Sequence, residues 1–351
     1  MQLPFRGPLV VTDDESLTAY LTRAAAAAGV VPEFVRDTRD ALTSWSSAPL
    51  VLVGVDQLDP LAELAPLRRA AVHVVGLGDL RDEVFRTALV CGASTVLELP
   101  LAERQLADLL SDAVAGESEP GVMVGVVGGS GGVGSTTFAA ALAVSCASGS
   151  DTMLVDLDPY GGGVDRVIGV EATDGIRWEQ LAEAAGRFSA RSLRDALPRR
   201  GSLSVLCWSA DRAASLSAQT VRSALSAGRR GHQVVVIDLP RAPDPIGDEV
   251  LARCDHVVLV SSMTVPGLAA AALVARRLPA DRTGVVIRGR GGIQDVAVEH
   301  LLGLPVWHRM PDQRRLDESV SLGLGPLRAG RGPLAKAARQ VSGVLALEAA
   351  S

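Results

Sequence analysis

Apolar runs of strand length alternate with alanine- and leucine-rich stretches of helix length along the whole chain of 351 residues. This alternation is typical of parallel sheets covered by helices, because each parallel strand must be followed by a crossover before the next one begins. A second α/β domain is expected to open at Val122–Val127, where another apolar run follows a polar segment. Before it, five strands are expected, at Leu9–Thr12, Val30–Val35, Leu50–Val55, Val72–Leu77 and Thr95–Leu97.

Charge and composition predict the boundary between the two domains. Residues 1–120 carry 18 acidic and 9 basic side chains, whereas the remainder carries 22 acidic and 25 basic ones. The segment 117–121 is short and polar and contains Pro120, as linkers do. We therefore expect one domain at 1–116, a linker at 117–121 and a larger domain at 122–351, each long enough to bury its own core.

A glycine-rich loop follows the expected strand Val122–Val127. It reads Gly129-Ser130-Gly131-Gly132-Val133-Gly134-Ser135-Thr136, and Thr137 comes next. Glycines let the backbone curl so that its N–H groups point at phosphate oxygens, and the following helix adds its positive N-terminal dipole. Residues 129–137 are therefore expected to bind nucleotide phosphates. Ser135 stands where such loops carry the phosphate-binding lysine, and Lys336 is the only lysine in the chain.

Two further apolar strands end in aspartates, Leu154-Val155-Asp156-Leu157-Asp158-Pro159 and Val234-Val235-Val236-Ile237-Asp238. With the loop, these motifs resemble the ParA/MinD family of deviant Walker-type ATPases across residues 121–347. The resemblance implies that Thr136 and Asp238 hold Mg²⁺, that Asp156 orients the attacking water if the site is active, and that Asp158 supports the switch region.

The chain departs from that family where the family binds phosphate and base. The family's loop reads K-G-G-x-G-K-[ST], and both lysines are serines here, Ser130 and Ser135. Losing one charge-assisted contact costs about 1.5–3 kcal/mol, so ATP or ADP with Mg²⁺ is expected to bind weakly or not at all, and hydrolysis to be weak or absent. Arg288 replaces the asparagine that reads adenine, and Pro311 and Asp312 match the element that borders the base.

The first domain resembles a response-regulator receiver, a flavodoxin-like fold. Asp13 and Asp14 match the receiver's acidic metal-binding pair. Gly54 takes the place of the phosphoacceptor aspartate and Leu99 that of the lysine. This pocket is therefore expected to be degenerate, leaving a module for dimerisation or partner docking. The alternative is that Asp56 is a displaced acceptor.

A receiver-like domain joined to a degenerate ParA/MinD-like domain resembles the CpaE/TadZ proteins. The segments 175–178 and 204–208 are similar to those of the actinobacterial septum-site-determining (Ssd) branch. The resemblance implies a cytoplasmic, homodimeric spatial regulator, concentrated at the septum or pole, with division or pilus and secretion proteins as partners. One alternative is an active ATPase switch in which Arg166 or Arg241 replaces the lysines. Another is a DNA-binding partitioning protein, since residues 281–351 hold 10 basic and 7 acidic side chains.

The sequence shows neither an N-terminal signal pattern nor an apolar run of the roughly 18 residues that a membrane span needs. The stretch Leu334–Leu347 fits a terminal helix of the larger domain, with Leu334, Ala338, Val341 and Leu345 on one face. Membrane contact is therefore expected only through partners. The four cysteines lack the spacing of a metal site and are expected to be buried thiols.

Overall fold

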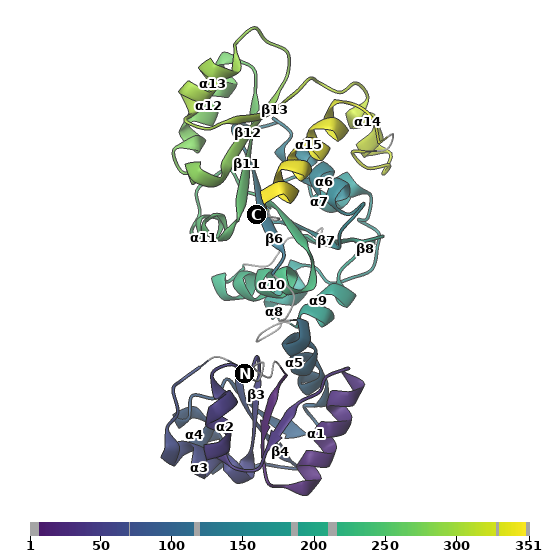
Figure 1. The fold of residues 1–351 in the computed structure, drawn as a ribbon. Coiled ribbons are helices and arrows are strands. Elements are labelled where there is room, and N and C mark those ends of the chain that lie inside the picture. Colours follow the sequence, from purple (N-terminus) through teal and green to yellow (C-terminus); the bar gives the residue numbers. More distant parts are fainter. Residues whose placement is uncertain are drawn as a thin grey trace. The chain divides into compact units, whose positions relative to one another are not determined.

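The computed structural model describes residues 7–69, 71–115, 120–183, 189–209, 216–327 and 330–348. The chain divides into two compact units, Met1–Glu119 with Ser189–Ser192, and Pro120–Phe188 with Leu193–Ser351. Each unit is built on its own sheet (Figure 1). Residues 117–119 of the expected linker lie outside the described residues.

The first unit is a five-stranded parallel sheet with the strand order β2-β1-β3-β4-β5. This order is that of flavodoxin-like folds and confirms the predicted class. The strands are β1 (Leu9–Val11), β2 (Glu33–Val35), β3 (Val51–Gly54), β4 (Val72–Leu77) and β5 (Thr95–Leu99). The helices are α1 (Glu15–Ala27), α2 (Thr38–Trp45), α3 (Leu58–Leu64), α4 (Asp82–Val90) and α5 (Glu103–Ala115), with a 3-10 turn, η1, at Val55–Gln57.

Helices cover both faces of this sheet. Leu17 of α1 and Leu106 of α5 are buried against one face, and Trp45 of α2 and Leu61 of α3 against the other. The edge strand β2 is shorter than the expected Val30–Val35. It begins only after Pro32, which has no N–H to contribute to the ladder.

The second unit contains the remaining elements, apart from the first three residues of α9, 190–192, which group with the first unit. Its strands are β6 (Val122–Gly128), β7 (Thr152–Asp156), β8 (Arg199–Arg200), β9 (Leu203–Leu206), β10 (Val234–Leu239), β11 (His256–Ser262), β12 (Thr283–Arg288) and β13 (Val306–Met310). Its helices are α6 (Ser135–Cys146), α7 (Val164–Ile168), α8 (Trp178–Glu183), α9 (Ala190–Ala196), α10 (Ala218–Gly231), α11 (Pro245–Arg253), α12 (Val265–Ala275), α13 (Asp295–Leu302), α14 (Leu316–Ser321) and α15 (Pro333–Glu348), with a 3-10 turn, η2, at Ala280–Arg282.

The strands of the second unit form one sheet in the order β13-β12-β11-β6-β10-β7-β9-β8. All neighbours are parallel except β8, which runs antiparallel to β9. In a parallel sheet the carboxyl ends of all strands lie at one edge, where ligands bind in open α/β folds. The loop after β6 and the ends of β7, β10 and β12 therefore meet at this edge.

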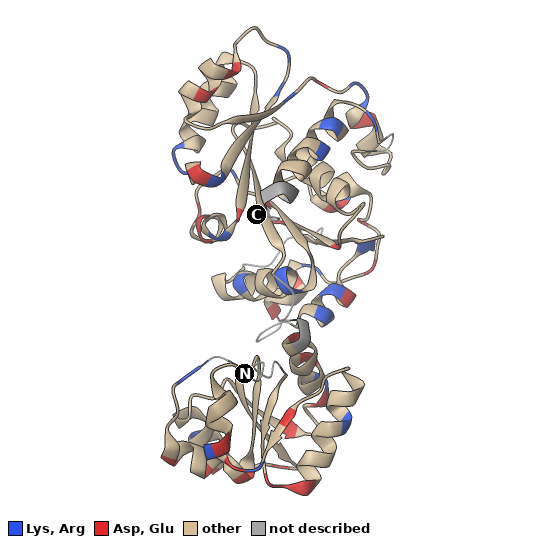
Figure 2. Ribbon diagram, in the orientation of Figure 1, with Lys and Arg blue, Asp and Glu red and all other residues tan. Residues whose placement is uncertain are grey.

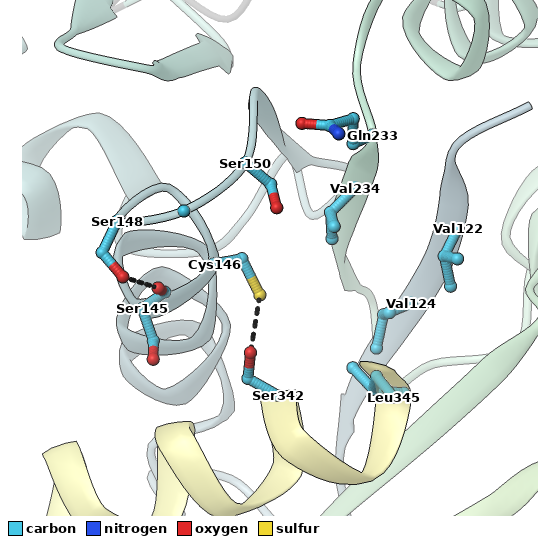
Figure 3. A pocket seen from close by; sticks show the side chains of 11 residues that line it. Val122, Val124, Ser145, Cys146, Ser148, Ser150, Gln233, Val234, Ser342 and Leu345 are labelled. Atoms are coloured by element: carbon cyan, nitrogen blue, oxygen red, sulfur yellow. Dashed lines mark hydrogen bonds between the residues drawn. The ribbon is translucent and has the colours of Figure 1, made fainter. Parts of the chain in front are cut away.

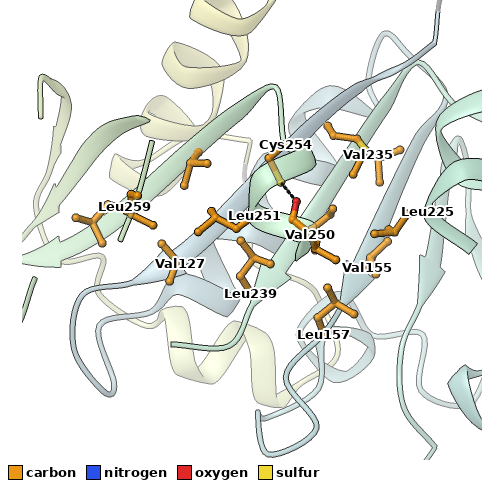
Figure 4. Close-up of a cluster of buried hydrophobic side chains, with 14 of the residues drawn as sticks. Val127, Val155, Leu157, Leu225, Val235, Leu239, Val250, Leu251, Cys254 and Leu259 are labelled. Carbon is orange, nitrogen blue, oxygen red and sulfur yellow. Dashed lines mark hydrogen bonds between the residues drawn. The ribbon is translucent and has the colours of Figure 1, made fainter. Parts of the chain in front are cut away.

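Two hydrophobic layers lie on opposite faces of this sheet. One is formed with α8, α10, α11, α12 and α13 and includes Leu225, Val235 and Leu259 (Figure 4). The other is formed with α6, α7 and α15. The residues Leu334, Ala338, Val341 and Leu345 of α15 are all buried in it, as the spacing predicts. Among the helices described, none has both the length and the apolarity that a membrane crossing requires.

Candidate functional site

The glycine-rich loop, residues 129–134, connects β6 to α6 with a backbone that requires glycine. Gly132 and Gly134 have φ angles of 69° and 92°, in the left-handed region that glycine favours. Gly129 has no room for a side chain, because a Cβ there would lie 2.6 Å from the Cβ of Ala271. Its N–H donates to the carbonyl of Val260 at 2.8 Å, which ties the loop to β11.

The helix after the loop begins at Ser135, and no side chain caps its N-terminus. The first N–H groups of such a helix lack partners within it, so they are available to an anion. A Cβ built on Gly128 would lie 2.9 Å from Ser135 Oγ, which places this hydroxyl against the end of β6. Ser130 and the half-buried Thr137 are also uncharged. The loop therefore offers an anion backbone N–H groups and a helix dipole, without a cation of its own.

Two buried aspartates lie side by side at the carboxyl ends of β7 and β10. Asp156 and Asp238 are paired positions of the two neighbouring strands and are 1% and 2% exposed. The carboxylate of Asp156 accepts the N–H groups of Asp158, at 3.0 Å, and Val164, at 3.2 Å. The Thr136 side chain hydrogen-bonds the Asp238 carboxyl. A hydroxyl next to a carboxylate is a donor set suited to Mg²⁺, which uses few protein ligands when phosphates supply the others.

The Asp238 carboxyl is strongly perturbed. Burial, followed by the nearby carboxylate of Asp156, raises its pKa to about 8, while the hydrogen bond from Thr136 acts in the opposite direction and Asp158 adds to the rise. Asp238 therefore holds a proton near neutral pH, because burial and the neighbouring carboxylates disfavour its charged form.

Arg288, at the end of β12, reaches the loop. Its Nη1 donates to the carbonyl of Val133 at 3.1 Å, and its Nε donates to the carboxylate of Asp312 at 2.8 Å. Pro311 and Asp312 directly follow β13, the neighbour of β12. A Cβ on Gly134 would lie 3.1 Å from the Arg288 guanidinium. Arg288 and Asp312 therefore form an ion pair at the outer edge of the loop, close to the backbone that is expected to bind phosphate.

Two contacts at this edge are not predicted by the sequence motifs. The pairing of Arg288 with the Val133 carbonyl joins residues 155 positions apart. The indole Nε1 of Trp178 donates to the backbone carbonyl of Asp156 at 2.7 Å and is fully buried. The only signal for the first is that Arg288 and Asp312, of opposite charge, follow successive strands. No signal in the sequence indicates the second.

The receiver-like pocket of the first unit is closed by its own side chains. Asp56 accepts hydrogen bonds from the Thr12 hydroxyl, at 2.7 Å, and from the Asp13 N–H, at 2.7 Å. A side chain at Gly54 would collide with the Asp56 carboxylate and lie 2.6 Å from the Thr12 hydroxyl. The carboxylate of Asp56 therefore lies over Gly54 and is tied to the end of β1.

The other residues that were predicted to form this pocket cap a helix, pack in the core or lie at the surface. Asp14 is the N-cap of α1 and accepts the N–H groups of Ser16 and Leu17. Leu99 is 1% exposed and belongs to the core beneath α1 and α5. Asp13 is exposed, 3.8 Å from Arg36. Among the residues that the structure describes, no three His, Cys, Asp or Glu side chains gather as a metal-binding group.

A cavity of about 430 Å³ lies at the opposite, amino end of the larger sheet (Figure 3). It is lined by the first residues of β6 and β10 and by Ser145, Cys146 and Ser342, and the Cys146 thiol lies 3.5 Å from the Ser342 hydroxyl. No charged side chain lines it among the described residues. Cys146, Cys207 and Cys254 are buried free thiols that form no disulfide. Burial raises the pKa of the thiols of Cys207 and Cys254 to about 12.

Solved structures define the class to which the larger unit belongs. A ParA family ATPase from Chlorobium tepidum TLS matches 63% of this chain and 97% of its own length, with a TM-score of 0.57 and 18% identity. The septum site-determining protein MinD from Pyrococcus horikoshii OT3, solved with Mg-ADP, matches 64% of this chain and 95% of its own, with a TM-score of 0.54 and 18% identity. The larger unit therefore has the ParA/MinD fold, as predicted.

Sequence comparisons identify the family. Residues 11–121 match a family model described as the Rv3660c-like, CheY-like N-terminal domain. Uncharacterized protein Rv3660c from Mycobacterium tuberculosis strain H37Rv is 38% identical over 340 residues, which covers 95% of this chain and 96% of that protein. This chain belongs to the Rv3660c-like family, with an N-terminal CheY-like domain and a C-terminal part that structurally resembles ParA/MinD ATPases.

Proposed function

We propose that this protein is a spatial regulator that positions septum or pilus and secretion machinery, and that its loop binds ATP weakly or not at all. The observation that carries the proposal is the loop, whose backbone suits phosphate while Ser130 and Ser135 leave it without a lysine. MinD, which shares the fold, is a septum site-determining protein. On this proposal the chain resembles the CpaE/TadZ proteins, with the actinobacterial Ssd branch the most similar.

Arg288, a cation that contacts the loop, is already engaged. Arg288 is bonded to Asp312 and to the Val133 carbonyl, so a phosphate must compete with a carboxylate for it. Without a lysine, phosphate binding loses about 1.5–3 kcal/mol, a roughly tenfold to hundredfold weaker affinity. Turnover loses more, because negative charge develops on the phosphates in the transition state. Such a protein therefore acts by binding partners at its surface rather than by turning over ATP.

On this proposal the protein is a cytoplasmic homodimer, concentrated at the septum or pole, that recruits division or pilus and secretion proteins. The CheY-like unit supports a docking role because Asp56, whose carboxylate lies over the phosphoacceptor position, is tied to Thr12 and Asp13. A pocket held in this way suits a docking or dimerisation module that works without phosphorylation.

The second candidate is an active ATPase switch. Two contacts favour it, Thr136 with Asp238 and Asp156 with the N–H of Asp158, together with the strand register that pairs Asp156 with Asp238. These preserve the Mg²⁺ side of the site even though the loop lacks its lysine.

DNA binding has less support. Acidic and basic residues alternate along the ribbon of the larger unit (Figure 2). Within the basic C-terminal region, Arg288, Arg309 and Arg315 each lie beside an acidic partner. Paired arginines offer DNA little free charge. Strong salt dependence of DNA affinity would favour this candidate.

The test is titration of the full-length protein with a fluorescent ATP analogue, with and without Mg²⁺. We expect weak or absent binding by the wild type and tighter binding by Ser135→Lys, whose lysine restores the missing charge. Ser148→Lys, on the turn after α6, is the matched control because it adds the same charge away from the loop. Tight Mg²⁺-dependent binding by the wild type that is lost in Asp238→Ala would establish the switch instead.

Positioning is tested separately with a fluorescent fusion in the native host. The proposal expects foci at septa or poles, and expects them to persist in Asp238→Ala. A uniform distribution in the cell would contradict a positioning role, whatever the result with nucleotide.

A further inference from the structure

A second cavity of about 430 Å³ lies in the larger unit, and none of its lining residues belongs to the glycine-rich loop. Its walls come from α7, from the segment 171–177 that leads into α8, and from the residues after β9. Its charged lining residues and its tryptophan are Asp165, Arg166, Glu171, Asp174, Arg177 and Trp208. This composition differs from the uncharged lining of the cavity at the amino end of the sheet.

Two polar groups in this lining have no hydrogen-bonding partner among the residues that the structure describes. Asp165 is 9% exposed, and no described residue donates a hydrogen bond to its carboxylate. The indole Nε1 of Trp208 is buried and also has no partner. Leaving a buried polar group unpaired costs about 1–3 kcal/mol, and more for a charged one. A ligand that donates to Asp165 would supply a partner for this carboxylate.

The charges of the lining favour a cation. Three carboxylates, those of Asp165, Glu171 and Asp174, face two guanidinium groups. Arg177 keeps its charge while it donates to the carbonyls of Gly175, at 3.4 Å, and Thr173, at 3.2 Å, so the lining has one more acidic than basic side chain. The balance of the lining is therefore acidic.

We propose that this cavity binds the basic side chain of an arginine or lysine, as a free amino acid or within a peptide. The guanidinium or ammonium group pairs with Asp165 and lies against the Trp208 side chain, which lines the cavity. Glu171 and Asp174, at the rim, add attraction for the cation.

The cavity is connected to the candidate site by two indoles. The rings of Trp208 and Trp178 have centroids 6.3 Å apart, and Trp178 donates to the Asp156 carbonyl. A ligand against Trp208 is therefore separated from the acidic strand β7 by one further side chain. The same contact makes tryptophan fluorescence a reporter of occupancy.

The test is calorimetric titration of the full-length protein with N-acetyl-arginine amide, with fluorescence followed in parallel. N-acetyl-citrulline amide is the matched neutral probe, since it has nearly the same shape without the charge. We expect saturable binding of the arginine probe and at least about tenfold weaker binding of the citrulline probe, as a lost charge-assisted hydrogen bond predicts. L-arginine and L-lysine as further probes distinguish a free amino acid from a peptide residue.

Asp165→Asn is expected to weaken binding of the arginine probe by at least about tenfold, and Trp208→Phe to remove the fluorescence response. Asp281→Asn, an exposed acid elsewhere in the same unit, is the control. Should circular dichroism show that Asp165→Asn does not fold, the exposed double variant Glu171→Gln/Asp174→Asn decides, and it should bind the probe several-fold more weakly. Absence of saturable binding at millimolar concentration, or equal affinity for arginine and citrulline probes, overturns the proposal.

Discussion

The guanidinium of Arg288 lies between the carboxylate of Asp312, 2.8 Å from its Nε, and the carbonyl of Val133, 3.1 Å from its Nη1. One cation thus joins the end of β13 to the glycine-rich loop. Both side chains of the ion pair are partly exposed, at 36% for Arg288 and 67% for Asp312, so the pair itself contributes little to stability. The ion pair instead affects ligand binding, because Asp312 reduces the positive charge that Arg288 can offer to a phosphate.

Removing the competing carboxylate should therefore strengthen phosphate binding. We expect Asp312→Ala to bind a fluorescent ATP analogue roughly two- to fivefold more tightly, which matches the 0.2–1 kcal/mol of an exposed ion pair. Arg288→Ala should bind more weakly than the wild type, and the double variant should equal Arg288→Ala. Asp317→Ala, a nearby exposed acid, controls for net charge. Weaker binding by Asp312→Ala would show that this carboxylate contacts the nucleotide favourably.

The close approach of Gly129 to α12 should make this glycine intolerant of any side chain. Gly129→Ala places a Cβ 2.6 Å from the Cβ of Ala271, and overpacking of this kind costs about 1–3 kcal/mol. Urea unfolding of the larger unit would measure the loss. The double variant Gly129→Ala/Ala271→Gly should recover part of it.

Gly131→Ala is the matched control, since nothing lies within 4 Å of a Cβ there. An equal loss in Gly129→Ala and Gly131→Ala would mean that the loop backbone, rather than contact with Ala271, sets the requirement.

Stability of the larger unit should depend on pH through Asp238. Its folded pKa of about 8 exceeds the ordinary value of 3.8, so between these values the folded state holds a proton that the unfolded state has lost. The stability contributed by the neutral carboxyl is complete below about pH 4 and falls as the pH rises towards 8. Asp238→Asn cannot ionise and should lack this fall.

The measurement is the free energy of unfolding in urea at about pH 5 and about pH 8, with EDTA present so that no divalent cation binds Asp238. Relative to the wild type, Asp238→Asn should gain about 4 kcal/mol between the two conditions. Asp255→Asn, at an aspartate with a different environment beside Arg229, serves as the comparison. The same pH slope in wild type and Asp238→Asn would refute the assignment.

In the CheY-like unit, Asp56 should behave as a structural residue. Asp56→Ala removes the acceptor of the Thr12 hydroxyl and the Asp13 N–H and is expected to lower the thermal stability of this unit by about 1–3 kcal/mol. Asp79→Ala, at an exposed acid after β4, should have little effect. Incorporation of phosphate from acetyl phosphate that disappears in Asp56→Ala would instead identify Asp56 as a displaced acceptor.

The fold was predictable because its signals are local. Strand-length apolar runs, the glycine-rich loop and aspartates at strand ends all lie within short windows, and parallel topology then brings Asp156 and Asp238 together at one edge. The same windows also contain Asp14, but a sequence does not distinguish an N-cap from a metal ligand. Its role in capping α1 emerged only from the backbone.

The contacts that modulate the site could not be predicted, because each joins distant segments through side-chain reach. Arg288 meets Val133 across 155 positions, and Trp178 meets the Asp156 carbonyl across 22. Periodicity and motifs carry no information on such pairs. The engagement of Arg288 by Asp312 likewise depends on two rotamers, although the order of their strands places them near each other.

The packing of α15 on α6 has a consequence for how the protein is made. Leu334, Val341 and Leu345 bury the helix that begins at Ser135, and they are synthesised roughly 200 residues after it. While the ribosome is still translating, the helix behind the glycine-rich loop has an uncovered apolar flank. We therefore expect α6, and with it the loop, to be packed fully only once α15 has been made, so a chain that lacks α15 is not expected to capture nucleotide through this edge.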